Sequence, residues 1–385
     1  MATTLPLERH DPTAPPARYR WLQEHEPVSR VVGADGLPAW LVTSHDLVAA
    51  GLADPRLGLT PPGVPVDERA SLFRDGPAHT RLRRLVARAF TPRRVAELAP
   101  RIEALADEHV AAFVTAADEG PADLVDLVAG PLAVGSLGLL LGVALEDHPR
   151  FRVLVDDALR ADPSDHALLA EAERAWGALM GFTSELVAGA RERPADDLLS
   201  ALVGIRDADD GRLDDGELVA LVTALLAAGV ITIRGGLAVG VVHLLREDAL
   251  AAFASRSDTT EVVEELVRRA GVEVFPRWAQ ADLELGGVAI AAGEKVLLRL
   301  EAANHDPARF ADPEALCPGR PGPHLGFGRG PHHCLGAALA RVELAAALTA
   351  LSRRAPGLRL AVPVEEIPWH RSEVDSGPTM LMLHT

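Results

Sequence analysis

A glycine-rich loop surrounds one of the two cysteines in this chain. Residues 327–336 read F-G-R-G-P-H-H-C-L-G, and a helix-forming run follows from Ala337 to Leu348. Glycine lets a backbone turn tightly and approach a flat partner closely. The dipole and the free N–H groups of a helix start favour a thiolate over a thiol. Cys334 therefore stands where a thiolate could bind a metal ion.

Two interpretations of Cys334 are open from the loop alone. The other cysteine, Cys317, is not part of a C-x-x-C pair, so a zinc site lacks ligands, and we interpret Cys317 as structural. A single soft ligand on a glycine-cushioned loop suits the axial position of haem iron. Isolated cysteines, however, are most often buried and inert. The rest of the chain has to decide between the two.

Composition limits the class of protein. With 385 residues and 48% hydrophobic content the chain can bury a large core, and its net charge of −17 argues against nucleic-acid binding. Two cysteines cannot form a disulfide framework, which favours a reducing compartment. Residues 1–16 resemble neither a signal peptide nor a membrane anchor. The longest apolar run, 218–233, is shorter than the roughly 20 residues of a bilayer span. We expect a cytoplasmic protein.

Hydrophobic periodicity predicts a mainly α protein with small β-sheets. No repeat and no linker divides the chain, so we expect one domain. The Pro-rich segment 57–75 is expected to be a loop that covers a pocket. The expected parts are a β-rich section at about 28–57, a helical body at about 78–270, β pieces with an irregular stretch and the cysteine loop at about 271–336, and a C-terminal helix and β-hairpin at 337–385.

The longest predicted helix begins at a capping pattern, Asp214 and Glu217, and can continue to Arg246. At 1.5 Å per residue it would be about 48 Å long. Its middle is apolar on all sides, which predicts burial. Small residues at 227–229 make a notch where a flat group could lie, and Thr232 follows. A threonine inside a helix most often bonds back to the preceding turn.

A shorter predicted helix, 259–270, carries Glu265 and Arg268 three residues apart. Such a pair is usually a surface salt bridge that contributes little. The stretch from 303 to 330 is rich in Pro and Gly, and an ordered irregular segment of that length needs an internal clamp. Glu265 and Arg268 could therefore form either an ordinary surface salt bridge or the clamp that holds this irregular segment.

Together these pieces resemble the bacterial cytochrome P450 family of haem-thiolate monooxygenases over nearly the whole chain. The loop fits the family signature F-G-x-G-x-H-x-C-x-G at every fixed position. The resemblance implies haem b held between the long helix and the loop, with Cys334 as the axial ligand of the iron. It also implies that Phe327 and Gly336 contact the haem on the cysteine side and Ala228 and Gly229 on the other.

Three further motifs extend the resemblance. E-L-V-R at 265–268 looks like the family's E-x-x-R, whose pair locks with a later arginine, here Arg320. H-T-R-L-R at 79–83 looks like the haem-propionate contacts. The implied contacts are His79, Arg83, Arg277 and His332. Cations and hydrogen-bond donors around two carboxylates are electrostatically favourable.

The long helix departs from the family pattern [AG]-G-x-[DE]-T. The alcohol is present as Thr232, the implied catalytic residue, whereas Ile231 replaces the acid. In the usual mechanism that pair relays protons during oxygen activation, and an isoleucine cannot carry a proton. A subset similar to mycocyclosin synthase, which couples aromatic rings, shares this helix motif. By that analogy Val230, Ile231 and Asp375 are substrate-pocket candidates, although Asp375 could equally be a solvated turn residue.

Between His79 and Arg94 the chain has six arginines and no acid. On an acidic chain this predicts a local basic patch, made of Arg81, Arg84, Arg88 and Arg329, on the cysteine side of the haem. Docking of a ferredoxin is the use that the resemblance implies, with a solvated helix face as the alternative.

Three functions follow. The first is oxidation of a natural product with ferredoxin-supplied electrons, with aromatic coupling or cross-linking as the reaction that the missing acid favours. The second is hydroxylation or epoxidation of a small apolar, polyketide or peptide substrate. The third is non-catalytic haem binding or sensing.

Overall fold

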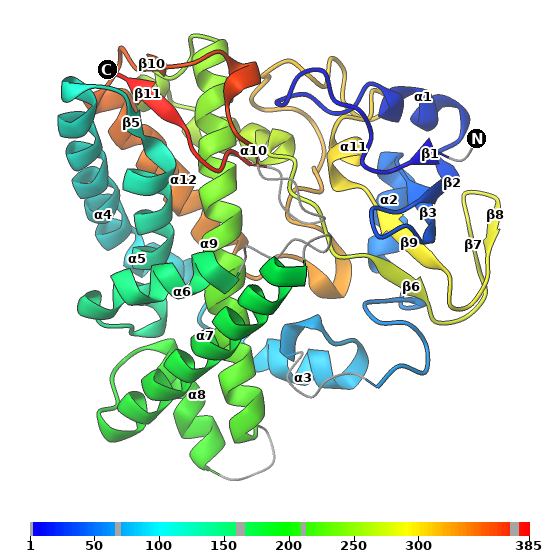
Figure 1. Cartoon of the computed structure of the whole chain (residues 1–385), viewed down its shortest axis with the longest axis horizontal. Coiled ribbons are helices and arrows are strands. Elements are labelled where there is room, and N and C mark those ends of the chain that lie inside the picture. The colour runs from blue at the N-terminus through cyan, green and yellow to red at the C-terminus, as the bar shows by residue number, and fades with distance from the viewer. Residues whose placement is uncertain (1–2, 66–70, 159–165, 209–212, 370–376) are drawn as a thin grey trace.

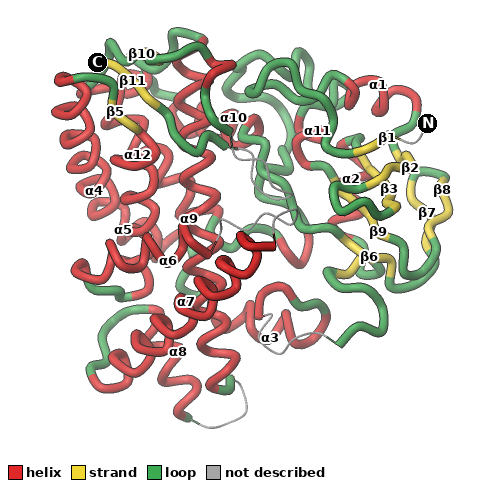
Figure 2. Tube along the Cα trace, in the orientation of Figure 1, coloured by secondary structure: helices red, strands yellow, loops and turns green. Residues whose placement is uncertain are grey.

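The computed structural model describes residues 3–65, 71–158, 166–208, 213–369 and 377–385. A helical part and a β-rich part lie side by side, and the cysteine loop leads directly into helix α12 (Ala337–Arg354) of the helical part (Figure 1; Figure 2). The described residues are mainly helical with small sheets, so the predicted fold class is confirmed.

The central helix, α9 (Asp215–Arg246), organises the helical part. The Asp214 carboxylate accepts the N–H of Glu217 at 2.7 Å, and the Glu217 side chain accepts the N–H of Asp214 at 3.3 Å, which completes the predicted capping box. By length and composition α9 could cross a membrane, which the 218–233 run alone did not suggest. Its most apolar window is 67% buried inside the fold, so α9 is the core helix.

Other helices pack around α9. Contacts join it to α5 (Gly130–Leu141), α7 (His166–Glu192), α10 (Thr259–Arg269) and α12 (Ala337–Arg354). The remaining helices are α1 (Arg18–His25), α2 (His45–Ala53), α3 (Gly76–Ala87), α4 (Pro92–Glu119), α6 (His148–Ala158), α8 (Leu198–Asp207) and α11 (Leu300–Asn304). Short 3-10 turns lie at Ser71–Phe73, Leu145–Asp147, Phe253–Ser255, Gly330–His332 and Val364–Glu366.

Three features of the helical part do not follow from hydrophobic periodicity: one divided helix and two short helices. The run 124–141 is divided into a π-helical turn, Val125–Ala129, followed by α5. Pro131 supplies no N–H to the turn before it, and this weakens regular α-helical bonding there. The helices α1 and α8 were not expected, because each is short, with 8 and 10 residues.

The β-rich part is built on a six-stranded sheet. Its order is β1 (Thr3–Thr4), β2 (Val28–Val32), β3 (Pro38–Val42), β9 (Lys295–Leu298), β6 (Arg277–Ala279) and β4 (Leu57–Gly58). Within the predicted β-rich section, β2 and β3 form a hairpin, with Gly36 at φ 75° in its turn. The parallel pairing of β3 with β9 joins distant parts of the chain and places Arg277 on the neighbouring strand.

Two smaller sheets complete the fold. A hairpin of β7 (Leu283–Leu285) and β8 (Val288–Ile290) turns at Gly286 and Gly287. A three-stranded sheet orders β10 (Arg359–Leu360), β11 (Met382–His384) and β5 (Ala122–Asp123). It ties the C-terminal strand to the helical part.

Candidate cofactor-binding site

The cysteine loop is closed by its own backbone. The N–H of Cys334 donates to the carbonyl of Phe327 at 2.8 Å. Gly328 and Gly330 adopt φ values of 67° and 75°, which glycine takes without strain. At Gly330 a Cβ atom would lie 2.6 Å from the carbonyl oxygen of Leu52, so a side chain there would collide with backbone. The glycines that the sequence singled out therefore shape the loop.

The Cys334 thiol lies at the surface of the described residues, yet the protein around it excludes much of the water. This desolvation raises the pKa of the thiol above its usual value, against the lowering effects of the Gly336 N–H and of Arg83 and Arg341. The N–H at the helix start favours the thiolate, in the direction expected from the sequence, but burial outweighs this effect. A coordinating metal removes the thiol proton outright.

The structure brings the three clamp residues together. Arg268 donates from Nε and Nη2 to Glu265 at 2.8 and 2.9 Å, and Arg320 Nε donates to Glu265 Oε1 at 2.8 Å. The side chains of Arg268 and Glu265 are only 1% and 4% exposed. Arg268 also donates to the carbonyls of Asn304 and Pro313, which fastens the irregular stretch to α10.

Basic groups gather beside the loop from separate elements. The rings of His79 (α3) and His332 lie 4.2 Å apart, and Arg83 donates to the carbonyl of His333. Arg277 (β6) is buried and donates to the carbonyl of Phe275 at 2.6 Å. The structure thus collects all four predicted propionate contacts.

Negative charge in this cluster is scarce. Asp75 accepts a hydrogen bond from His332 at 2.9 Å. Burial lowers the pKa of Arg277, and the negative charge of Asp75 partly offsets that effect. Burial lowers the pKa of His79 to about 4, helped by the charges of His332 and Arg83, and its Nε2 is buried without a hydrogen-bond partner among the described residues. Two arginines and two histidines, of which Arg277 and His79 are buried, offer cationic and hydrogen-bond donor groups that fit a dianionic ligand.

On α9 a small open face interrupts the burial. Ala228 and Thr232, one turn apart, are exposed, and Ile231 is half-buried. The Thr232 hydroxyl donates to the carbonyl of Ala228 at 3.1 Å, the back-bonding expected of a helical threonine. Thr232 thus lies on the side of α9 that protein does not cover.

Two of the distal candidates, Val230 and Gly229, do not lie on this open face. Val230 is 1% exposed and packs into the hydrophobic core rather than onto the open face. A Cβ atom on Gly229 would lie 2.7 Å from the side chain of Leu137, so this glycine admits the neighbouring helix α5. Asp375 lies outside the described residues.

The predicted basic patch is smaller than expected. Arg84, Arg88 and Arg329 are exposed, and within the described ranges no ion pair involves them. Arg81 instead donates two hydrogen bonds to Glu217 at the start of α9, where Arg74 also approaches. Its charge is neutralised locally, so Arg81 is removed from the patch.

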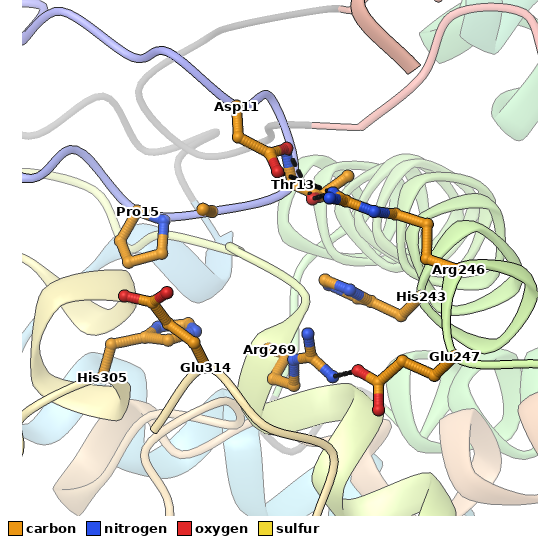
Figure 3. Close-up of a pocket in the computed structure, with 10 residues that line it drawn as sticks. Asp11, Thr13, Pro15, His243, Arg246, Glu247, Arg269, His305 and Glu314 are labelled. Carbon is orange, nitrogen blue, oxygen red and sulfur yellow. Dashed lines mark hydrogen bonds and ion pairs between the residues drawn. The ribbon is translucent and has the colours of Figure 1, made fainter. Parts of the chain in front are cut away.

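A pocket of about 240 Å³ lies near the C-terminal end of α9 (Figure 3). Its charged groups pair with each other, Arg246 with Asp11 at 2.6 Å and Arg269 with Glu247 at 2.8 Å. None of the predicted site residues lines it. This pocket is therefore separate from the cysteine loop and from Thr232.

Some contacts at the site were not foreseen. Asp75 orients His332, and Glu264 binds both His324 and Arg341. The sequence does contain a signal for the Glu264 contacts. Glu264 and Glu265 are adjacent, and the pair with Arg268 uses only Glu265, which leaves Glu264 available for another basic partner. Asp75 carried no signal, because its partner lies 257 residues away.

Comparison with known proteins agrees with the geometry. The family model described as Cytochrome P450 matches residues 251–354. The mycinamicin IV hydroxylase/epoxidase of Micromonospora griseorubida is 42% identical over 380 residues, 94% of each chain. The nocardicin C N-oxygenase of Nocardia uniformis subsp. tsuyamanensis is 39% identical over 383 residues, again 94% of each. A crystal structure of SgvP, a candidate thioether synthase of griseoviridin tailoring, matches with a TM-score of 0.91, 36% identity and complete coverage of both chains.

The fold and the cysteine loop define a haem-thiolate oxidoreductase. The chain belongs to the cytochrome P450 family, and haem b is its cofactor. Several relatives are named hydroxylases or oxygenases, so the expectation of an enzyme is confirmed and the sensing interpretation is set aside. The residues described above fit the cofactor: one thiol on a closed loop, and a cationic cluster short of carboxylates.

Proposed function

We propose that this protein is a cytoplasmic monooxygenase that hydroxylates or epoxidises a small natural product with electrons from a ferredoxin. The observation that carries the proposal is the cluster of His79, Arg83, Arg277 and His332 beside the Cys334 loop. Support for the reaction comes from relatives named as a mycinamicin IV hydroxylase/epoxidase and a 6-deoxyerythronolide B hydroxylase, the latter 36% identical. These names favour oxygen insertion over aromatic coupling.

The chain's own residues would divide the work as follows. Bound haem b supplies a redox-active iron that activates dioxygen for insertion into a C–H or C=C bond. Cys334 would ligate the iron, and the cationic cluster would bind the propionates. The Thr232 hydroxyl, free to turn from the carbonyl of Ala228, would hold a water or a substrate hydroxyl on the open face. Ile231 carries no proton, so the proton would come through that water or from the substrate.

The reduced, carbon-monoxide-bound spectrum tests the assignment. We expect the far-red-shifted Soret band of thiolate ligation in the wild type, its loss in Cys334→Ala, and its retention in the control Cys317→Ala. A wild type without this band, or a band that survives Cys334→Ala, would overturn the proposal.

A second candidate, oxidative aromatic coupling or cross-linking, is favoured by one observation, the half-buried Ile231 where the family usually has an acid. Coupling removes a hydrogen atom from each ring and inserts no oxygen. Turnover under labelled dioxygen separates the two: label in the product supports oxygen insertion, and a coupled product without label supports the second candidate.

The ferredoxin would dock on Arg84, Arg88 and Arg329. Exposed cations on an acidic chain steer an acidic partner, and salt screens that attraction. We expect Arg84→Glu with Arg88→Glu to slow ferredoxin-supported reduction at low salt, with the double variant Arg353→Glu, at the end of α12, and Arg359→Glu, on β10, as the charge-matched control. Equal rates in the two double variants would exclude this docking surface.

A further inference from the structure

Arg341 of α12 connects the cysteine loop to α10. Its guanidinium lies over the Phe327 ring, 4.5 Å from the centroid, and the Phe327 carbonyl accepts the N–H of Cys334. Nη1 donates to the carbonyl of Ala337, one turn earlier on α12, at 3.1 Å. The guanidinium is therefore held against the segment that carries the thiol.

Glu264 holds the other side of the guanidinium. It accepts from Nε of Arg341 at 2.5 Å and from Nη2 at 2.9 Å, and His324 Nε2 lies 3.0 Å from the same carboxylate. Such two-pronged contact fixes a guanidinium in both position and plane. Burial alone would raise the pKa of Glu264, but the hydrogen bonds from His324 and Arg341 lower it to about 2, so the carboxylate is ionised near neutral pH.

Arg341 and Cys334 act on each other through charge. Arg341 and Arg83 are the cations whose charges favour the thiolate. The pKa of Arg341 is raised first by its hydrogen bond to Glu264, with a smaller contribution from the charge of Cys334. Arg83 donates to the His333 carbonyl without a carboxylate partner in the described part of the chain. Arg341 differs, because Glu264 offsets its charge.

We infer that Glu264 and Arg341 form a positioning pair that sets the positive charge felt by the Cys334 ligand and thereby the reduction potential of the iron. This inference rests on the proposed role of Cys334. The oxidised centre carries one more positive charge than the reduced centre, so a nearby cation favours reduction. Removing Arg341 and removing Glu264 must therefore shift the potential in opposite directions.

Redox titration of the haem-loaded protein tests the pair. We expect a negative shift of the midpoint potential in Arg341→Gln and a positive shift in Glu264→Gln. Arg341→Lys keeps the charge but loses the two-pronged contact, so its shift should be smaller than that of Arg341→Gln. The controls Arg353→Gln, about 18 Å further along α12, and Glu261→Gln on α10 change the net charge equally and should shift the potential less.

Shifts of the same sign in both variants, or shifts no larger than those of the controls, would overturn the inference. If Arg341→Gln fails to retain haem, the sign of the Glu264→Gln shift decides alone. The wild-type carbon-monoxide spectrum separates the two levels: a normal thiolate band with unshifted variants refutes only the pair, whereas an absent band refutes the proposed function.

Discussion

The two sides of the site differ in how their polar groups are satisfied. On the cysteine side, Glu265 and Arg268 are buried and fully engaged, and Glu264 and Arg341 add a second, parallel pair. On the α9 side, the exposed Thr232 hydroxyl makes only a bond back to its own helix. In these two pairs the protein supplies both partners, whereas the Thr232 hydroxyl can leave its bond to the Ala228 carbonyl for another partner.

The difference indicates where the chain can vary its chemistry. A paired, buried network tolerates little change, because any lost partner leaves an uncompensated charge. An open face with one hydroxyl imposes no such cost, so substitution there alters reactivity more than stability. Four experiments challenge this contrast.

The largest loss of stability is expected from Arg268→Ala. Removing one partner of a buried ion pair costs about 3–5 kcal/mol of unfolding free energy, here with the anchors to the Asn304 and Pro313 carbonyls also lost. Urea denaturation measures it. Arg256→Ala breaks the surface pair with Asp258 and should leave stability nearly unchanged; similar losses in the two variants would contradict the contrast.

Next is Gly330→Ala in the cysteine loop, with Gly63→Ala as its match. Both glycines have φ 75°, and positive φ costs a non-glycine residue about 1–2 kcal/mol. No atom lies within 4 Å of a Cβ at Gly63, whereas one at Gly330 would meet the Leu52 carbonyl. We therefore expect Gly330→Ala to lose more stability and to retain less haem. Equal losses of stability in the two variants would show that the positive φ, and not the collision with the Leu52 carbonyl, determines the cost of the substitution.

Acid should weaken the cysteine side through His305. Burial first, then the charges of Arg268 and Arg269, lowers the pKa of this histidine to about 3. In the unfolded chain this histidine has an ordinary pKa near 6.5. Between about pH 3 and pH 6.5 the histidine is therefore protonated in the unfolded chain and neutral in the folded protein. Stability should therefore fall as pH drops below about 6.5, by about 1.4 kcal/mol per pH unit.

Denaturation at pH 7.5 and pH 5 checks this, with His305→Gln expected to flatten the slope. His10→Gln, at an exposed histidine, should leave the slope unchanged. A slope unaffected by His305→Gln would assign the acid sensitivity to other groups.

The smallest effect on stability is expected from Thr232→Ala, below about 0.5 kcal/mol, because the side chain is exposed. Product formed per electron consumed should nevertheless fall. Thr223→Ala, in the same helix, removes a buried hydroxyl bonded to Thr183 at 3.0 Å and should cost about 1–3 kcal/mol. A stable Thr232→Ala variant with full coupling of electrons to product would remove Thr232 from the mechanism.

Local patterns in the sequence were enough for much of this fold. The Asp214–Glu217 cap, the β2–β3 hairpin and the glycines of the cysteine loop each depend on residues within a few positions of one another. Backbone conformation and short-range hydrogen bonds decide such features, so sequence spacing is sufficient. The long, evenly apolar middle of α9 likewise predicted its burial.

Tertiary structure alone decided the contacts between distant residues. Arg81 meets Glu217 across 136 positions, Arg341 meets Glu264 across 77, and Gly229 admits Leu137 of another helix. The pKa of Cys334 depends in the same way on how much surrounding protein displaces water from the thiol. Partner distance and desolvation are properties of the packed molecule, and the spacing of residues along the chain does not contain them.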